Sequence, residues 1–287
     1  MHGYNVYICL LIVNVHNKSL VRGTNILTHM TKAIFALFLL LNSSFVASDY
    51  VGQLSPNITI TSSHLGYDVQ YRVFIPKHYS ELDDLPTIYV TDGQDYIKSG
   101  EMPRLMKRLV GQNRMRPAIA VFIDSRDTAN LSHNRRNSQF VCNYQYFEFV
   151  TTELVNKIDS DYRTSPNAED RVILGLSLGG LNSACFGLLA SDTFTGIAMQ
   201  SPYTLPVPDL IGYYEKSERL PLNFFISTGA RNDGRRQTRV LQKALEKKGY
   251  PIKYREVGGS HDWYNWRPLL DDILVYYFPQ EKLIDGP

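Results

Sequence analysis

The stretch Arg171–Gly180 reads RVILGLSLGG, and it decides how the rest of this chain is interpreted. The apolar run Val172–Leu174 is typical of a buried strand, and Leu181–Leu189 has the composition of a helix. Ser177 therefore lies on a strand-to-helix turn with a glycine two residues away on either side. This is the pattern of a nucleophile elbow, where only small neighbours fit around a strained, exposed serine. A tight glycine-rich turn without chemistry is the alternative.

Past Asp49 the chain alternates strand-like and helix-like stretches. The expected strands are Asn57–Ser62, Tyr67–Pro76, Thr87–Val90, Ala118–Ile123, Val172–Leu174, Ile197–Met199, Phe224–Ser227 and Tyr254–Val257. The expected helices are Met102–Val110, Phe147–Ile158, Leu181–Leu189, Gln237–Lys248 and Pro268–Phe278. The first two strands suit an antiparallel pair. Buried strands separated by helices predict an α/β fold whose mostly parallel central sheet is flanked by helices on both faces.

Composition excludes several classes of protein. Of the 287 residues, 44% are hydrophobic and 20% are charged, which suits neither a disordered chain nor a polytopic membrane protein. The 30 basic and 28 acidic residues nearly balance, and no dense Lys/Arg run suggests a nucleic-acid partner. No cluster of histidine and cysteine has metal-ligand spacing, so we expect neither a metal nor another cofactor.

The N-terminal segment has the features of a secretory signal peptide. Residues 30–48 read MTKAIFALFLLLNSSFVAS, with a basic start, an apolar run and small residues at the end. The run is shorter than the ~20 apolar residues that span a bilayer. We therefore expect translation to start at Met30, a non-fold segment at residues 1–48 and a catalytic domain at 49–287. A buried helix, or a membrane anchor reinforced by Tyr4–Val15, is the alternative.

If the signal is cleaved, the mature protein is periplasmic or secreted and has no stable membrane insertion. Cys9 is then lost, and Cys142 and Cys185 remain. An oxidising compartment would permit these two cysteines to pair. Because Cys185 falls within an apolar helix pattern, we expect it to be a buried free thiol instead.

A serine nucleophile needs a base, and the base needs an acid to orient it. In hydrolases with a nucleophile elbow the chain order is serine, acid, histidine. His261 is the only histidine after Ser177, in a glycine-rich loop just past the last expected strand. Asp233 is the favoured acid because it follows the strand Phe224–Ser227 at its carboxyl end. The other acids in the interval fit caps, loops, helices or strands better: Asp192, Asp209, Glu215, Glu218, Glu246 and Glu256.

Asp233 has a second interpretation, as the N-cap of a helix beginning near Gly234. Two backbone N–H groups are candidates for stabilising an oxyanion. One belongs to Leu178, at the N-terminus of the helix after the elbow. The other belongs to Gln94, because Gly93 forms a turn directly after the strand Thr87–Val90.

Four blocks carry a resemblance to a known family: YVTDGQ at 89–94, GLSLGG at 175–180, GARND at 229–233 and GGSHDWYNWR at 258–267. Over about residues 60–279 the chain resembles the esterase family of α/β-hydrolases, which includes esterase D-like enzymes, feruloyl esterases, enterochelin esterases and mycolyltransferases. The resemblance implies a single α/β-hydrolase domain. It also implies a triad of Ser177, Asp233 and His261, with oxyanion donors at Leu178 and Gln94.

Two further blocks, FIDSRDT at 122–128 and RNSQFVCN at 136–143, resemble the enterochelin-esterase branch. Gln139 replaces the glutamate usual there, and residues are inserted between Thr128 and Arg136. A siderophore ester is therefore a hypothesis. Arg136 and Trp263 are the candidate substrate contacts. Alternatively, Arg135 and Arg136 are solvated or paired within the protein and do not bind substrate. Trp266 likewise serves as an anchor of the core in this alternative interpretation.

The sequence thus predicts a serine esterase that hydrolyses a small-molecule carboxylic ester through an acyl-enzyme. An acyltransferase would use the same three residues and pass the acyl group to an alcohol. A non-catalytic binding protein that has kept the hydrolase fold is the third hypothesis.

Overall fold

Strand pairing joins nine segments of the chain into one sheet. The computed structural model describes residues 52–280, so the predictions for residues 1–48 lie outside the described part. The sheet order is β1-β3-β5-β4-β6-β7-β8-β9, and β2 pairs with β3. The strands are β1 (Gln53–Leu54), β2 (Ile58–Thr61), β3 (Asp68–Ile75), β4 (Thr87–Val90), β5 (Ile119–Ile123), β6 (Arg171–Leu176), β7 (Gly196–Gln200), β8 (Asn223–Gly229) and β9 (Ile252–Val257).

The predicted fold class is confirmed. Strands β5, β4, β6, β7, β8 and β9 run parallel to one another, whereas β3 is antiparallel to β1, β2 and β5. Every predicted strand is present, and β4 has the predicted bounds. Strand β6 lies between β4 and β7 and is buried along its whole length, so the turn that follows it emerges from the centre of the sheet.

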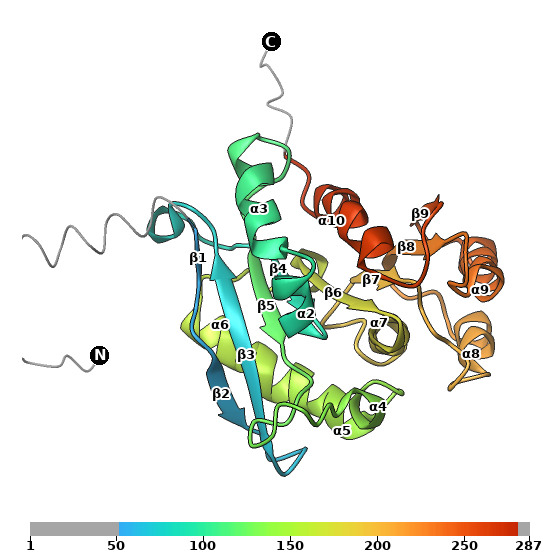
Figure 1. Ribbon diagram of the computed structural model, residues 1–287, viewed down its shortest axis with the longest axis horizontal. Coiled ribbons are helices and arrows are strands. Elements are labelled where there is room, and N and C mark those ends of the chain that lie inside the picture. The colour runs from blue at the N-terminus through green and yellow to red at the C-terminus, as the bar shows by residue number, and fades with distance from the viewer. Residues whose placement is uncertain (1–51, 281–287) are drawn as a thin grey trace, which may run out of the picture. The chain divides into compact units, whose positions relative to one another are not determined.

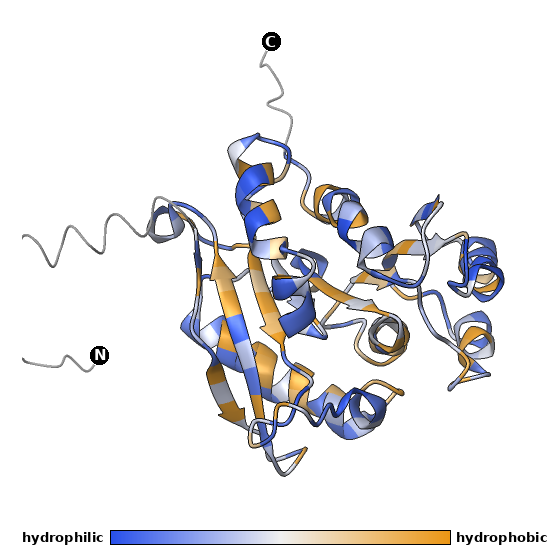
Figure 2. Ribbon diagram, viewed as in Figure 1, coloured by the Kyte–Doolittle hydropathy of each residue, from blue (hydrophilic) through white to orange (hydrophobic). Residues whose placement is uncertain are grey.

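Helices cover both faces of this sheet (Figure 1). One layer contains α5 (Tyr144–Glu148), the π-helical η2 (Phe149–Leu154), α6 (Val155–Asp161), α7 (Leu178–Leu189), α8 (Leu210–Lys216) and α9 (Arg235–Lys247). The other contains α2 (Gly93–Lys98), α3 (Met102–Gly111) and α10 (Trp263–Tyr277). The central strands are hydrophobic, and α3 carries both hydrophobic and hydrophilic residues (Figure 2). Among residues 52–280, no helix combines the length and apolar character needed to cross a membrane.

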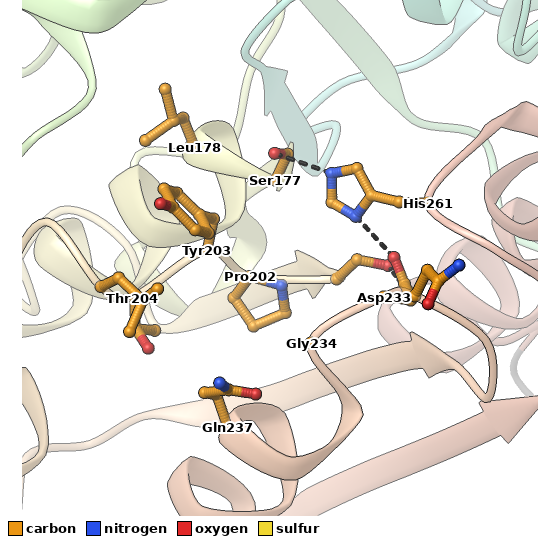
Figure 3. A pocket seen from close by; sticks show the side chains of 12 residues that line it. Ser177, Leu178, Pro202, Tyr203, Thr204, Asp233, Gly234, Gln237 and His261 are labelled. Carbon is orange, nitrogen blue, oxygen red and sulfur yellow. Dashed lines mark hydrogen bonds and ion pairs between the residues drawn. The ribbon is translucent and has the colours of Figure 1, made fainter.

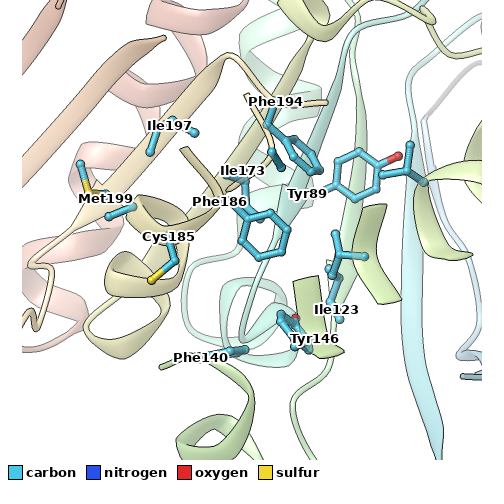
Figure 4. Packing of buried hydrophobic residues seen from close by; sticks show 14 of the residues in the cluster. Tyr89, Ile123, Phe140, Tyr146, Ile173, Cys185, Phe186, Phe194, Ile197 and Met199 are labelled. Carbon is cyan, nitrogen blue, oxygen red and sulfur yellow. The ribbon is translucent and has the colours of Figure 1, made fainter. Parts of the chain in front are cut away.

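Alternation along β4 divides the core between the two layers. Tyr89 packs into the layer that contains α7, whereas its neighbours Ile88 and Val90 pack toward α3 and α10. Tyr89 and Phe186 both meet the ring of Phe194 edge to face, at 5.3 and 5.7 Å between ring centroids (Figure 4). Such pairs add about 0.5–1.5 kcal/mol each beyond the burial of area. The packing fixes α7, the helix that follows Ser177, against the sheet.

The helix boundaries differ from the predictions where a cap or a tertiary contact decides them. The last helix begins at Trp263, before Pro268, because the Asp262 carboxylate accepts hydrogen bonds from the N–H groups of Tyr264 and Asn265. The predicted helix at 147–158 is part of the continuous run α5–η2–α6. Three short helices, α2, α4 (Arg136–Gln139) and α8, were not predicted, because none is long enough to show a helical period.

Cys185 is not a free thiol, so that expectation is wrong. It forms a disulfide with Cys142, with 5.3 Å between their Cα atoms. Cys142 follows α4 and adopts a positive φ of 45°, while Cys185 lies on α7. An apolar helix pattern describes the neighbours of Cys185 on its own helix only. The partner comes from a segment 43 residues away, which that pattern does not report.

The disulfide should stabilise the fold through the unfolded chain. For a separation of 43 residues, the loop-entropy relation gives roughly 4 kcal/mol. We expect a double variant, Cys142→Ala with Cys185→Ala, to lose about that much free energy of unfolding in guanidinium chloride. Reducing agent should destabilise the wild type similarly and leave the double variant unchanged. Equal denaturation midpoints for oxidised wild type and double variant would contradict the contribution.

Candidate active site

The turn after β6 holds Ser177 in a backbone conformation that few residues adopt, with φ 57° and ψ −118°. Close packing maintains it. A Cβ atom at Gly175 would lie 2.2 Å from the carbonyl oxygen of Gly179, and one at Gly179 would lie 2.7 Å from Thr91 Oγ1. Both positions therefore require glycine, which explains the spacing recognised in the sequence. The turn presents the Ser177 hydroxyl at the C-terminal edge of the sheet.

Three of the predicted residues meet at that edge (Figure 3). His261 Nε2 lies 2.9 Å from Ser177 Oγ, and His261 Nδ1 lies 2.5 Å from Asp233 Oδ1. A carboxylate only accepts hydrogen bonds, so Nδ1 carries the proton and Nε2 is free to accept from the serine hydroxyl. The Asp233 side chain is fully buried, whereas that of His261 is 37% exposed. The arrangement connects a buried acid to an accessible serine through one imidazole.

The carboxylate of Asp233 faces the site instead of capping α9. Gly234 occupies the N-cap position of that helix. The second carboxylate oxygen, Oδ2, accepts from the backbone N–H of Gly229, from Ser201 Oγ at 2.5 Å and from Asn265 Nδ2 at 3.0 Å. Burial of a charge is costly unless donors surround it, and this carboxylate has them.

The two predicted oxyanion donors lie at helix N-termini. Leu178 is the first residue of α7 and Gln94 the second residue of α2, where a helix supplies no acceptor for the N–H. The chain turns into α2 at Asp92, which has φ 53°. A Cβ at Gly93 would lie 2.4 Å from the backbone of Phe122, so the start of α2 is seated directly on β5.

A cavity of about 480 Å³ opens beside the serine. Four of its lining side chains are mainly apolar: Leu178, Pro202, Tyr203 and Leu205. Its other lining residues include Thr204, Asn232, Gly234 and Gln237, together with Ser177, Ser201, Asp233 and His261 (Figure 3). Tyr203 and Leu205 are exposed. The loop after β7 thus supplies most of the apolar lining.

Arg136 is engaged within the protein. Its guanidinium donates from Nε and Nη2 to the two carboxylate oxygens of Asp92, at 3.1 and 2.8 Å. Burial raises the pKa of Asp92, and Arg136 opposes that shift by stabilising the charged form. Arg135 pairs with Asp127 at 2.5 Å and lies over the ring of Tyr67. These contacts match the alternative of structurally paired arginines.

The two tryptophans do not line the cavity. Trp263 packs edge to face against Tyr96 and Trp266, with ring centroids 5.2 and 5.7 Å apart. Trp266 is buried, as expected of a core anchor, and its Nε1–H donates to Ser201 Oγ at 2.8 Å. Ser201 and Asn265 were not predicted as site residues: Ser201 lies outside the recognised blocks, and Asn265 lies within the block at 258–267 without a signal of its own. In the part of the chain that the structure describes, no three His, Cys, Asp or Glu residues converge as metal ligands.

Fold and site together define the class of protein: an esterase with the α/β-hydrolase fold. Residues 62–224 match the model of the family described as "Putative esterase", and the chain belongs to that family. The family description indicates ester chemistry as the class of reaction.

Individual relatives share only about a quarter of their residues with this chain. The chain is 27% identical over 225 residues to the uncharacterized protein YjcH of Bacillus subtilis, with 74% of this chain and 92% of the relative covered. It is 26% identical over 204 residues to the iron(III) enterobactin esterase of Escherichia coli K12, with 67% of this chain and 50% of that protein covered. The chain therefore spans half the length of that enterobactin esterase.

Solved structures show the same fold. An enterobactin esterase from Shigella flexneri, solved in the presence of enterobactin, aligns with a TM-score of 0.69 at 23% identity and covers 77% of this chain and 58% of its own. A ferulic acid esterase aligns with a TM-score of 0.69 at 20% identity, covering 80% of this chain and 98% of its own. The S-formylglutathione hydrolase of Staphylococcus aureus aligns with a TM-score of 0.62 at 14% identity, covering 79% and 97%.

Arg136→Met tests whether this arginine serves the fold or the substrate. The variant leaves the buried Asp92 carboxylate without its cation, so we expect a loss of about 3–5 kcal/mol in the free energy of unfolding, measured by urea denaturation. Adding Asp92→Asn should restore most of the loss, because the uncompensated charge is gone. An unchanged free energy of unfolding, with KM raised for anionic esters only, would instead make Arg136 a substrate contact.

Proposed function

We propose that the protein is a serine esterase that hydrolyses small-molecule carboxylic esters with Ser177 as nucleophile, His261 as base and Asp233 as the orienting acid. The observation that carries the proposal is the continuous hydrogen-bonded chain from the buried Asp233 through His261 to Ser177, beside an apolar cavity. Membership of the esterase family supports the same reaction class.

In the proposed mechanism, Ser177 Oγ attacks the ester carbonyl carbon while His261 Nε2 takes the hydroxyl proton. The imidazolium that forms is stabilised by Asp233, which accepts from Nδ1. The tetrahedral intermediate collapses, His261 returns the proton to the leaving alkoxide, and the alcohol departs. Water then attacks the acyl-enzyme with His261 again as base, which releases the carboxylic acid and restores the serine.

The N–H groups of Leu178 and Gln94 are the proposed oxyanion donors. Both lie at helix starts, where the dipole favours negative charge. A well-placed donor of this kind contributes about 3 kcal/mol to stabilising the transition state. None of these steps uses a metal or an organic cofactor.

A siderophore ester is a candidate substrate, because two curated relatives are iron(III) enterobactin esterases at 26% identity. A catecholate substrate is anionic, and recognition of its charge would call for available cations. Arg135 and Arg136 already pair with carboxylates in this structure. The mainly apolar lining of the cavity favours an uncharged ester instead.

Ser177→Ala removes the proposed nucleophile without disturbing the packing of the turn. We expect ester hydrolysis to fall about 10⁴-fold or more, because the residual rate comes from binding and oxyanion donors alone. The substrates are p-nitrophenyl acetate, a long-chain p-nitrophenyl ester, methyl ferulate and a catecholate tri-lactone with and without iron. Thermal unfolding should be unchanged in the variant.

The same panel separates the competing functions. Preference for the tri-lactone would establish a siderophore esterase, and turnover of the neutral esters alone would establish a general esterase. Products with an added acceptor alcohol reveal an acyltransferase. If a fluorophosphonate probe leaves Ser177 unlabelled and no ester is turned over, the protein is a binding module.

We also propose that the protein is exported, to the periplasm or the medium. The signal-like segment at residues 30–48 supports export, and so does the Cys142–Cys185 disulfide, because disulfides persist in oxidising compartments. Expression from Met30 in a secreting host should give a mature chain that begins near Asp49 and contains no free thiol. Intact-mass measurement with and without reduction checks both points. A chain that retains residues 30–48 and stays inside the cell would overturn export.

A further inference from the structure

The carboxylate of Asp233 has two oxygens with separate tasks. Oδ1 accepts only from His261 among the side chains of the described residues, whereas Oδ2 collects its other donors. Among these donors the hydroxyl of Ser201 is 2.5 Å from Oδ2 and comes from the end of β7. Thr228 Oγ1 is more distant, at 3.3 Å. The short contact makes Ser201 the side chain best placed to act on the charge of Asp233.

The indole of Trp266 determines which way the Ser201 hydroxyl points. Trp266 Nε1 lies 2.8 Å from Ser201 Oγ, and an indole nitrogen can only donate. Ser201 Oγ therefore accepts from Trp266 through a lone pair, and its own proton is left for Asp233 Oδ2. The result is a directed relay in which Trp266 donates to Ser201, Ser201 to Asp233 and His261 to Asp233.

Both members of the relay are held firmly. Ser201 is buried and has a positive φ of 47°, which costs free energy in a residue other than glycine and marks a position fixed by its surroundings. Its N–H donates to the carbonyl of Ser227. The carbonyl of Trp266 accepts from Gln200 Nε2 at 2.8 Å. The Trp266 ring also meets the His261 imidazole edge to face, at 4.9 Å between centroids.

We propose that Ser201 and Trp266 are positioning residues that set the proton affinity of the Asp233–His261 pair. This inference rests on the proposed function, since it concerns how the base of that site is tuned. Neither residue needs to touch the ester. Ser201 donates a hydrogen bond to the charged form of Asp233, and the Trp266 N–H orients that hydroxyl.

The direction of the change in the pKa of His261 follows from the negative charge on Asp233. Without the Ser201 hydroxyl, the negative charge on Asp233 is less dispersed and the carboxylate stabilises the imidazolium of His261 more strongly. His261 then stays protonated to higher pH, where it cannot act as base. The pKa of the acid limb of kcat/KM should therefore rise, by about half a unit to one unit for Ser201→Ala. Trp266→Phe keeps an aromatic ring beside His261 and removes the N–H together with part of the indole, while the Ser201 hydroxyl stays in place, so its rise should be smaller.

The experiment measures the pH dependence of kcat/KM for p-nitrophenyl acetate and, in parallel, the NMR titration of the His261 imidazole. The variants are Ser201→Ala, Trp266→Phe and the two combined. Tyr277→Phe is the matched control, because it also deletes an aromatic hydrogen-bond donor from α10, one that bonds the backbone carbonyls of Ile197 and Asn223 and not Ser201. It should leave the titration unchanged. Thermal unfolding checks that each variant is folded.

If Trp266 acts through Ser201, the effects of the two substitutions on the pKa of His261 are not additive. In the Ser201→Ala background, Trp266→Phe should cause no further shift, since the hydroxyl that it orients is absent. Unchanged titration of His261 in Ser201→Ala, or additive shifts in the double variant, would overturn the inference. The NMR titration does not need catalysis, so it distinguishes failure of the relay from failure of the proposed function, which would show as absent Ser177-dependent turnover.

Discussion

The backbone at Ser177 is the constraint on which the rest of the structure depends. A φ of 57° in a residue with a side chain is unfavourable, and it persists only because β6, α7 and the Thr91 loop pack around the turn. That packing in turn demands two glycines, whose absent side chains let the carbonyl of Gly179 and the hydroxyl of Thr91 approach. The strain is thus sustained by the centre of the sheet, where burial is greatest and local unfolding least favoured.

Sheet topology explains why residues 84 positions apart in the chain come within hydrogen-bonding distance. Parallel strands place their carboxyl ends along one edge. Ser177 follows β6, Ser201 follows β7, Asp233 follows β8 and His261 follows β9, so the chain order of these residues repeats the spatial order of the strands. Strand β7 separates the strand before Ser177 from the strand before Asp233. Its loop fills that interval with the apolar wall of the cavity and with a donor to Asp233.

The features that were predictable from the sequence are those that depend on residues adjacent in the chain. The bounds of β4 were predictable from a run of four β-branched or aromatic residues, and Ser177 from the steric signature of its two glycines. His261 followed from chain order alone. The choice of the disulfide over a free thiol and the hydrogen bonds of Ser201 were not predictable, because each depends on a partner brought in by tertiary structure. The start of α10 at Trp263 needed recognition of Asp262 as a cap, a signal present in the sequence but outweighed by Pro268.

Arg136 lies in a block that resembles the enterochelin-esterase branch, yet in the structure it pairs with the carboxylate of Asp92. Asp92 is buried beside the elbow, at the turn into the helix that carries Gln94, and an isolated buried carboxylate would be costly there. Arg136 removes that cost by bonding both carboxylate oxygens. The guanidinium is thereby paired within the protein, which leaves it less available to an anionic substrate. The cavity beside Ser177 is lined instead by the loop after β7, which contributes a proline, a tyrosine and a leucine side chain.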